Sequence, residues 1–181
     1  EQREAAAYDE AAVLKAKEEK AAKEKQIRAR AMTGGCPGSR MMQFDRASGK
    51  QQPSGTEQLQ GAVSELSQWP VQIKLAPVNA PYFEGADLLV AADCTAYAYA
   101  SFHQDFIRGR VTLIGCPKLD DVDYSEKLTE ILRRNELRSV TIVRMEVPCC
   151  GGLEQAVKTA LQNSGKMIPL QVRVISTDGR I

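Results

Sequence analysis

Short apolar runs alternate with longer helix-forming stretches through the second half of the chain. The run at residues 87–92 is nearly continuous in Leu, Val and Ala, which is typical of a strand covered on both faces of a sheet. The predicted strands are residues 71–75, 87–92, 111–114, 139–147 and 170–175, and the predicted helices are residues 57–68, 95–108, 125–135 and 152–163. This alternation predicts an α/β fold, a three-layer Rossmann-like domain with a mainly parallel sheet and right-handed crossovers.

Cysteines follow three of the predicted strands. Four of the five cysteines in the chain stand just after an apolar run, and these are Cys94, Cys116, Cys149 and Cys150. The carboxyl ends of parallel strands meet at one edge of a sheet, and ligands bind at that edge in open α/β sheets. We therefore expect these four thiols to gather in one place.

The fifth cysteine, Cys36, lies in the stretch GGCPG. Glycine permits unusual backbone angles and proline fixes φ, so such a loop could hold a rigid thiolate over the sheet edge. Side chains of adjacent residues diverge where a chain leaves a strand, so Cys149 and Cys150 are not expected to serve one small cluster together. The expected metal ligands are Cys36, Cys94, Cys116 and Cys149, with Cys150 as the alternative to Cys149.

Thiolates are the usual ligands of iron–sulfur clusters, and a [4Fe–4S] cluster takes about four of them. Zinc would accept the same four ligands in a structural site. A third interpretation is that each cysteine is a small buried apolar residue, since free cysteine is among the most buried residue types. The shared position after strands favours a cluster site, although the chain has no C-x-x-C pair.

Composition excludes several classes of partner. The net charge is +1 from 24 basic and 23 acidic side chains, so no strong field favours nucleic acid or an anionic membrane. No apolar run approaches the roughly 20 residues that span a bilayer, and no signal-peptide pattern opens the chain. An odd number of cysteines with an adjacent pair does not resemble a secreted disulfide framework, so we expect a reducing, cytoplasmic location.

Three segments are expected along the chain. Residues 1–32 are rich in Ala, Glu, Lys, Arg and Gln, which predicts a long charged helix with a thin apolar stripe. Residues 33–56 form the loop with Cys36 and a small, polar linker. Residues 57–181 form the α/β domain. Because the chain begins at Glu1, we expect it to be part of a longer polypeptide.

Other polar residues give weaker signals. Asp93 and Lys118 are expected to shape the electrostatics at the strand ends. The acidic stretch KLDDVDY could bind a hard cation, but it lacks the glycine and terminal glutamate of a calcium loop. His103 lies nine residues after Cys94, about 13 Å along a helix axis, so we expect a partly buried helix residue rather than a ligand.

The stretches LSQWPVQIKLAPVNAPYFEGADLLVAADCTAYAYASFH, RVTLIGCPKLDD and VTIVRMEVPCCGG resemble a family of anaerobe 4Fe–4S ferredoxin-type, iron–sulfur cluster-binding proteins. The resemblance covers nearly the whole chain. In that family a ferredoxin-like segment with its own cysteine motifs comes before a helix similar to REAAAYDEAAV, and the present chain starts after it. The resemblance implies iron–sulfur redox function and supplies no substrate.

The preferred hypothesis is an iron–sulfur electron-transfer protein that exchanges electrons with a redox partner or an upstream ferredoxin segment. The alternatives are a cluster- or dithiol-dependent reductase of a small substrate and a structural zinc-binding interaction module. No general base, nucleophilic serine or nucleotide-binding glycine motif was found in the sequence, which favours electron transfer over hydrolysis. Packing of the N-terminal helix against a second copy would make a homodimer.

Overall fold

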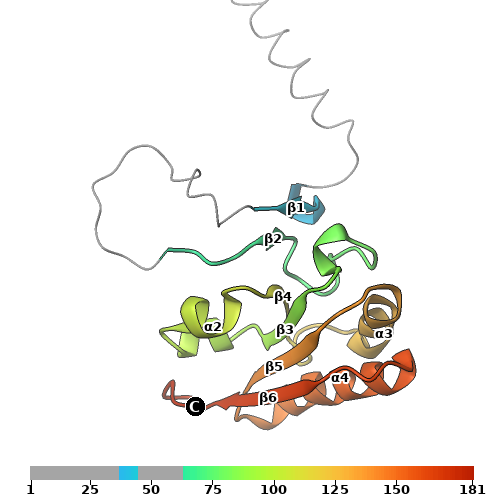
Figure 1. Cartoon of the computed structure of the whole chain (residues 1–181). Helices are drawn as coiled ribbons and strands as arrows, with labels where there is room; N and C mark the ends of the chain where they lie inside the picture. Colours follow the sequence, from blue (N-terminus) through green and yellow to red (C-terminus); the bar gives the residue numbers. More distant parts are fainter. Residues whose placement is uncertain (1–36, 45–62) are drawn as a thin grey trace, which may run out of the picture. The chain divides into compact units, whose positions relative to one another are not determined.

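The computed structural model describes residues 37–44 and 63–181 (Figure 1). Residues Gly38–Ile181 make one compact unit. The predicted helix at residues 1–32 lies outside the described residues, as do Cys36 and residues 45–56 of the loop and linker predicted at residues 33–56.

A parallel sheet forms the centre of this unit. It consists of four strands, β3 (Asp87–Ala92), β4 (Val111–Gly115), β5 (Ser139–Met145) and β6 (Leu170–Ile175). Their order is β4-β3-β5-β6, and every neighbouring pair is parallel. The predicted α/β fold is therefore confirmed, and the bounds of β3 and β6 match the predicted ones.

Helices connect the strands and cover both faces of the sheet. The short helix α2 (Thr95–Ala98) and a π-helical turn (His103–Ile107) lie between β3 and β4. Helix α3 (Tyr124–Arg134) follows β4, and α4 (Gly151–Ser164) follows β5. Helices α3 and α4 pack side by side (Figure 1).

The alternation of side chains along β5 shows which helices cover which face. Arg144 of β5 pairs with Glu154 of α4 at 2.6 Å, so this face carries α3 and α4. Thr141 lies three residues earlier and therefore on the opposite face. There it lines a cavity together with Phe106 of the π-helical turn. The three-layer arrangement follows from these two contacts.

The hydrophobic core lies between the sheet and its helices. Strand β3 is central, and its side chains from Leu88 to Ala92 are all buried. Helix α3 buries the stripe of Leu128, Ile131 and Leu132 that its helical spacing predicts. Phe102 and Phe106 also belong to the core, since both side chains are buried with ring centroids 5.2 Å apart.

An extended segment covers the outer edge of β4. Strands β1 (Met42–Gln43) and β2 (Gln68–Trp69) form a small antiparallel pair. The Gln68 side-chain amide donates to the carbonyl of Thr112 in β4, and Gln72 forms a parallel bridge with Ile114. The indole N–H of Trp69 donates to the carbonyl of Gly38 at 2.9 Å.

Two sequence predictions for this segment are wrong in part. The helix predicted at residues 57–68 does not reach its expected end, because residues 63–67 are non-helical and Gln68 pairs with β1. The strand predicted at residues 71–75 is a single bridge at Gln72, since the chain turns directly afterwards and the Leu75 and Ala76 amides both donate to the Gln72 carbonyl.

The helix predicted at residues 95–108 is interrupted. Tyr99 leaves the helical conformation with φ −105° and ψ 111°. Its hydroxyl then donates to Asp105 at 2.6 Å and its ring packs edge-on against Phe106. The hydroxyl of Thr95, the first residue of α2, donates backwards to the carbonyl of Ala92 at 2.7 Å.

Candidate functional site

Three strands of the sheet end together at its carboxyl edge. In the register of the parallel pairs, Ala92 of β3 stands beside Gly115 of β4, and Ala91 of β3 stands beside Val143 of β5. The chain moves from β3 to β4 on one side and then crosses to β5 on the other. This reversal is the topological switch point at which open α/β sheets bind ligands.

The four thiols described by the structure all follow these strand ends. Cys94 comes after β3, Cys116 after β4, and Cys149 and Cys150 form the 3₁₀ turn Pro148–Cys150 after β5. Cys94 and Cys149 are exposed to solvent, Cys116 is half-buried and Cys150 is buried. The sheet therefore presents thiols of very different accessibility at one edge.

The loop after β4 and the start of α4 approach each other across the end of β3. A Cβ atom added to Gly152 would lie 3.3 Å from the side chain of Pro117, which follows Cys116. Because β3 stands between β4 and β5, this contact closes the two cysteine-bearing loops over the central strand. Glycine at position 152 leaves room for that approach.

The surroundings of Cys150 favour its thiol form over the thiolate. Burial raises the pKa of Cys150 above its ordinary value, and the nearby Cys149 and Cys116 thiols raise it further. A hydrogen bond with the Met145 backbone opposes these effects. Cys149 and Cys150 also share a side-chain hydrogen bond, so the adjacent pair is in contact.

No three His, Cys, Asp or Glu side chains within residues 37–44 and 63–181 are arranged to hold a metal ion. Within these residues, Cys94, Cys116 and Cys149 are therefore not already close enough together to bind one metal ion. Cys36, the remaining expected ligand, lies outside the described residues.

A buried tyrosine supports the Cys116 loop. The Tyr124 hydroxyl donates a short hydrogen bond to the carboxylate of Asp120 and also forms a hydrogen bond with the Cys116 backbone. Burial, first, and then the bond to Asp120 raise the pKa of Tyr124. This contact was not predicted from the sequence, where an isolated tyrosine before a helix carries no signal for it.

Asp93 is the least satisfied polar side chain at the edge. One of its carboxylate oxygens is buried without a hydrogen-bond partner, and its side chain forms a hydrogen bond with Gln72. Burial and the nearby Asp120 raise the pKa of Asp93, while the bond with Gln72 lowers it. The expectation that Asp93 shapes local electrostatics agrees with this environment.

The acidic stretch KLDDVDY does not act as one unit. Asp120 bonds to Tyr124 and lies 3.5 Å from the Lys74 amine. Asp123 instead caps α3, accepting from the Ser125 amide at 2.8 Å, and this bonding lowers the pKa of Asp123. Asp121 and Lys118 are exposed.

His103 has a structural role. It is half-buried, as expected, and its Nδ1 accepts a hydrogen bond from the Glu65 amide at 3.1 Å.

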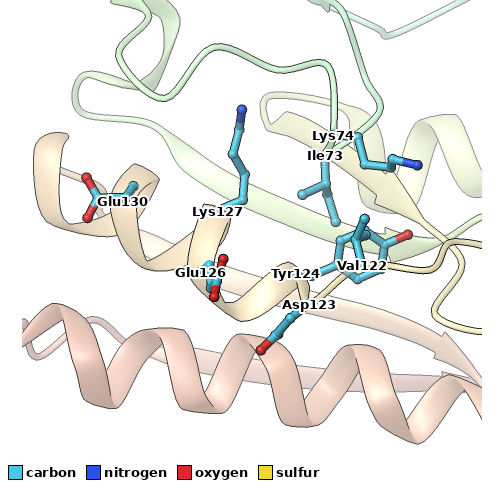
Figure 2. Close-up of a pocket in the computed structure, with 8 residues that line it drawn as sticks. All are labelled: Ile73, Lys74, Val122, Asp123, Tyr124, Glu126, Lys127 and Glu130. Atoms are coloured by element: carbon cyan, nitrogen blue, oxygen red, sulfur yellow. The ribbon is translucent and has the colours of Figure 1, made fainter.

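A groove beside α3 has a volume of about 580 Å³ (Figure 2). It contains none of the thiols, and Tyr124 is the residue that it shares with the carboxyl edge. Its lining residues are Ile73, Lys74, Val122, Asp123, Tyr124, Glu126, Lys127 and Glu130. The charged side chains point in different directions in Figure 2, so they do not converge on one ligand position.

Comparison with known proteins agrees with the architecture. Residues 80–181 match the family model described as "Rossmann-like domain", and the chain belongs to this family. It is also similar to an uncharacterized protein of Archaeoglobus fulgidus, with 30% identity over 120 residues that cover 66% of this chain and 84% of the relative. No solved structure matches. Among the helices that the structure describes, none is long and apolar enough to cross a membrane.

Proposed function

We propose that the carboxyl edge binds an iron–sulfur cluster, with 4Fe–4S the expected type, and that the chain is an electron-transfer protein. The observation that supports this most is the contact of Gly152 with Pro117, which closes the Cys116 and Cys149 loops over the end of β3, where Cys94 stands. Thiolates are the ligands that such clusters prefer. The resemblance to ferredoxin-type proteins supports the same class.

The proposed ligands are Cys36, Cys94, Cys116 and Cys149. Cys149 is favoured over its neighbour because it is exposed, whereas Cys150 is buried and its pKa is raised. A metal ligand must be a thiolate, and a raised pKa disfavours that form. Cys36 stands two residues before Gly38, whose carbonyl is held by the Trp69 indole.

The surrounding chain would orient the ligands and tune the cluster. Backbone amides in glycine- and proline-bearing loops can donate to cluster sulfur, which raises the reduction potential. Tyr124 holds the Cys116 backbone in place through its hydrogen bond. When bound, the cluster would supply one-electron redox chemistry to a redox partner protein or an upstream ferredoxin segment in a reducing cytoplasm.

Contact between Cys149 and Cys150 favours a second candidate, a dithiol reductase. The Cys149 thiolate would attack a substrate disulfide, forming a mixed disulfide and releasing one substrate thiol. Cys150 would then attack Cys149, releasing the second thiol and leaving a Cys149–Cys150 disulfide. The chain would supply two electrons and need an external dithiol reductant to recover. A structural zinc site is the third candidate.

Anaerobic purification and reconstitution with iron and sulfide separate these candidates. The proposal expects broad visible absorbance and about four iron and four sulfide per chain. A colourless protein with stoichiometric zinc would support the structural site. A metal-free protein that reduces a model disulfide, and loses this activity in both Cys149→Ser and Cys150→Ser, would support the dithiol reductase and contradict the cluster.

A further inference from the structure

A polar cavity of about 260 Å³ lies on the face of the sheet that carries α2 and the π-helical turn. Its polar lining residues are Tyr99, Asp105, Arg110, Thr141, Gln171 and Arg173. Thr141 stands four residues before Met145, the last residue of β5, or about 13 Å along the strand. The cavity is therefore separate from the thiols at the carboxyl edge.

Two arginines without a carboxylate partner meet at this cavity. Within residues 63–181, Arg110 and Arg173 are the arginines that form no ion pair. The remaining arginines of that range each pair with a carboxylate: Arg108, Arg133, Arg134, Arg138, Arg144 and Arg180. Arg110 and Arg173 line the same cavity although they come from distant parts of the chain.

Arg110 is held in place by the π-helical turn. Its Nη1 donates to the carbonyls of Asp105 and Phe106 at 3.2 and 2.8 Å. These bonds fix the guanidinium group and leave its other N–H donors for a ligand. A planar guanidinium group binds carboxylate or phosphate oxygens through two parallel hydrogen bonds.

An acceptor lies in the same cavity. The Tyr99 hydroxyl donates to Oδ2 of Asp105 at 2.6 Å. The carboxylate of Asp105 forms none of the ion pairs seen within residues 63–181. The second carboxylate oxygen of Asp105 could accept from a hydroxyl or ammonium group on a ligand.

We propose that this cavity binds a small organic anion whose carboxylate or phosphate group lies between Arg110 and Arg173, with a hydrogen-bond donor facing Asp105. The volume is below the roughly 300–1,000 Å³ of pockets for drug-sized ligands, so a small metabolite fits better than a nucleotide cofactor. This site is independent of the iron–sulfur proposal.

Isothermal titration calorimetry on the full chain, at constant ionic strength, tests the site with inorganic phosphate and succinate as probes. At least one probe should bind saturably with a dissociation constant of about 1 mM or tighter. Arg173→Gln should weaken that binding by about tenfold or more, because a charge-assisted pair is lost. Preference for phosphate or for succinate distinguishes the two anion types.

The matched control is Arg138→Gln, which removes an arginine that pairs with Asp87 outside the cavity. It should leave probe binding unchanged, as should Cys94→Ser. Arg110→Gln should repeat the effect of Arg173→Gln. Arg173 is exposed, so Arg173→Gln is expected to fold. This variant therefore tests the site even if Arg110→Gln unfolds because it loses the hydrogen bonds of Arg110 to the backbone. Failure of both probes to bind the intact chain, or equal weakening in Arg138→Gln, would overturn the proposal.

Discussion

The ring of Tyr124 lies directly against Gly115, so closely that a Cβ atom at residue 115 would stand 2.6 Å from the tyrosine hydroxyl oxygen. Gly115 is the last residue of β4, and Tyr124 is the first residue of α3. The contact fixes the helix start against the strand end and brings the hydroxyl to the Cys116 backbone. The position of the Cys116 loop at the carboxyl edge of the sheet therefore depends on glycine at residue 115.

Substituting Gly115→Ala should destabilise the fold. The added methyl group would overlap the hydroxyl and ring carbons of the buried Tyr124, and overpacking of this kind costs about 1–3 kcal/mol. Urea unfolding followed by circular dichroism measures the change. The control is Gly151→Ala, where a Cβ atom meets nothing within 4 Å and the backbone is already helical. Equal stability of Gly115→Ala and the wild type would show that Tyr124 can move aside.

The four described thiols should differ in reactivity in metal-free protein. Thiolate is the reactive form, and access to solvent sets how often the reagent meets it. Cys94 and Cys149 are exposed, whereas Cys150 is 5% exposed and its pKa is raised. N-ethylmaleimide should therefore label Cys94 and Cys149 first and Cys150 last, as measured by mass spectrometry of digested protein over time. Labelling of Cys150 as fast as its neighbour Cys149 would contradict the buried position.

The ion pairs of Glu154 should make stability depend on pH. Hydrogen bonds from Lys158, first, and from Arg144 lower the pKa of Glu154 below its ordinary value of 4.5. A lowered folded-state pKa gives stability that is present above 4.5 and lost as the pH falls through the folded-state value. Glu154→Gln should therefore cost about 1 kcal/mol near neutral pH, and this cost should disappear in acid, once the pH lies below the lowered pKa of Glu154.

Urea unfolding at both pH values measures this difference, with Glu84→Gln as the control. Glu84 is exposed and forms none of the ion pairs seen within residues 63–181, so its variant should match the wild type at both values. If Glu154→Gln still lowers the free energy of unfolding in acid, the loss of stability comes from packing and not from the charge of Glu154.

The local sequence pattern predicts all four strands of the parallel sheet, but it also predicts a strand at residues 71–75 that is only a bridge at Gln72. The bounds of β3 and β6 follow from apolar runs, and α3 follows from the spacing of Leu128, Ile131 and Leu132. The sequence does not predict that the helix expected at residues 95–108 is interrupted at Tyr99. The interruption is stabilised by contacts of Tyr99 with Asp105 and Phe106, and helix propensities do not take such contacts into account.

The position of the thiols after strands could be predicted, but their environment could not. In a parallel sheet the carboxyl ends of all strands lie at one edge, which is enough to predict that the thiols share this edge. The strand order β4-β3-β5-β6, which brings the ends of β3, β4 and β5 together, was found only in the structure. The Tyr124 contact and the convergence of Arg110 with Arg173 depend on packing between distant segments. Sequence spacing alone carries no information about such contacts.

The proposed ligand set makes a paired prediction for Cys36 and Cys150. After anaerobic reconstitution, Cys36→Ser should reduce the iron and sulfide content sharply, because a tetrathiolate site would lose one of its ligands. Cys150→Ser should retain the full content, since a buried thiol with a raised pKa is a poor ligand. Both variants remove a single sulfur atom, so they are closely matched. Full iron content in Cys36→Ser together with loss in Cys150→Ser would move the fourth ligand from Cys36 to the adjacent pair. Full content in both variants would instead indicate a cluster with three protein ligands and an open position, which is the geometry that a reductase of a small substrate requires.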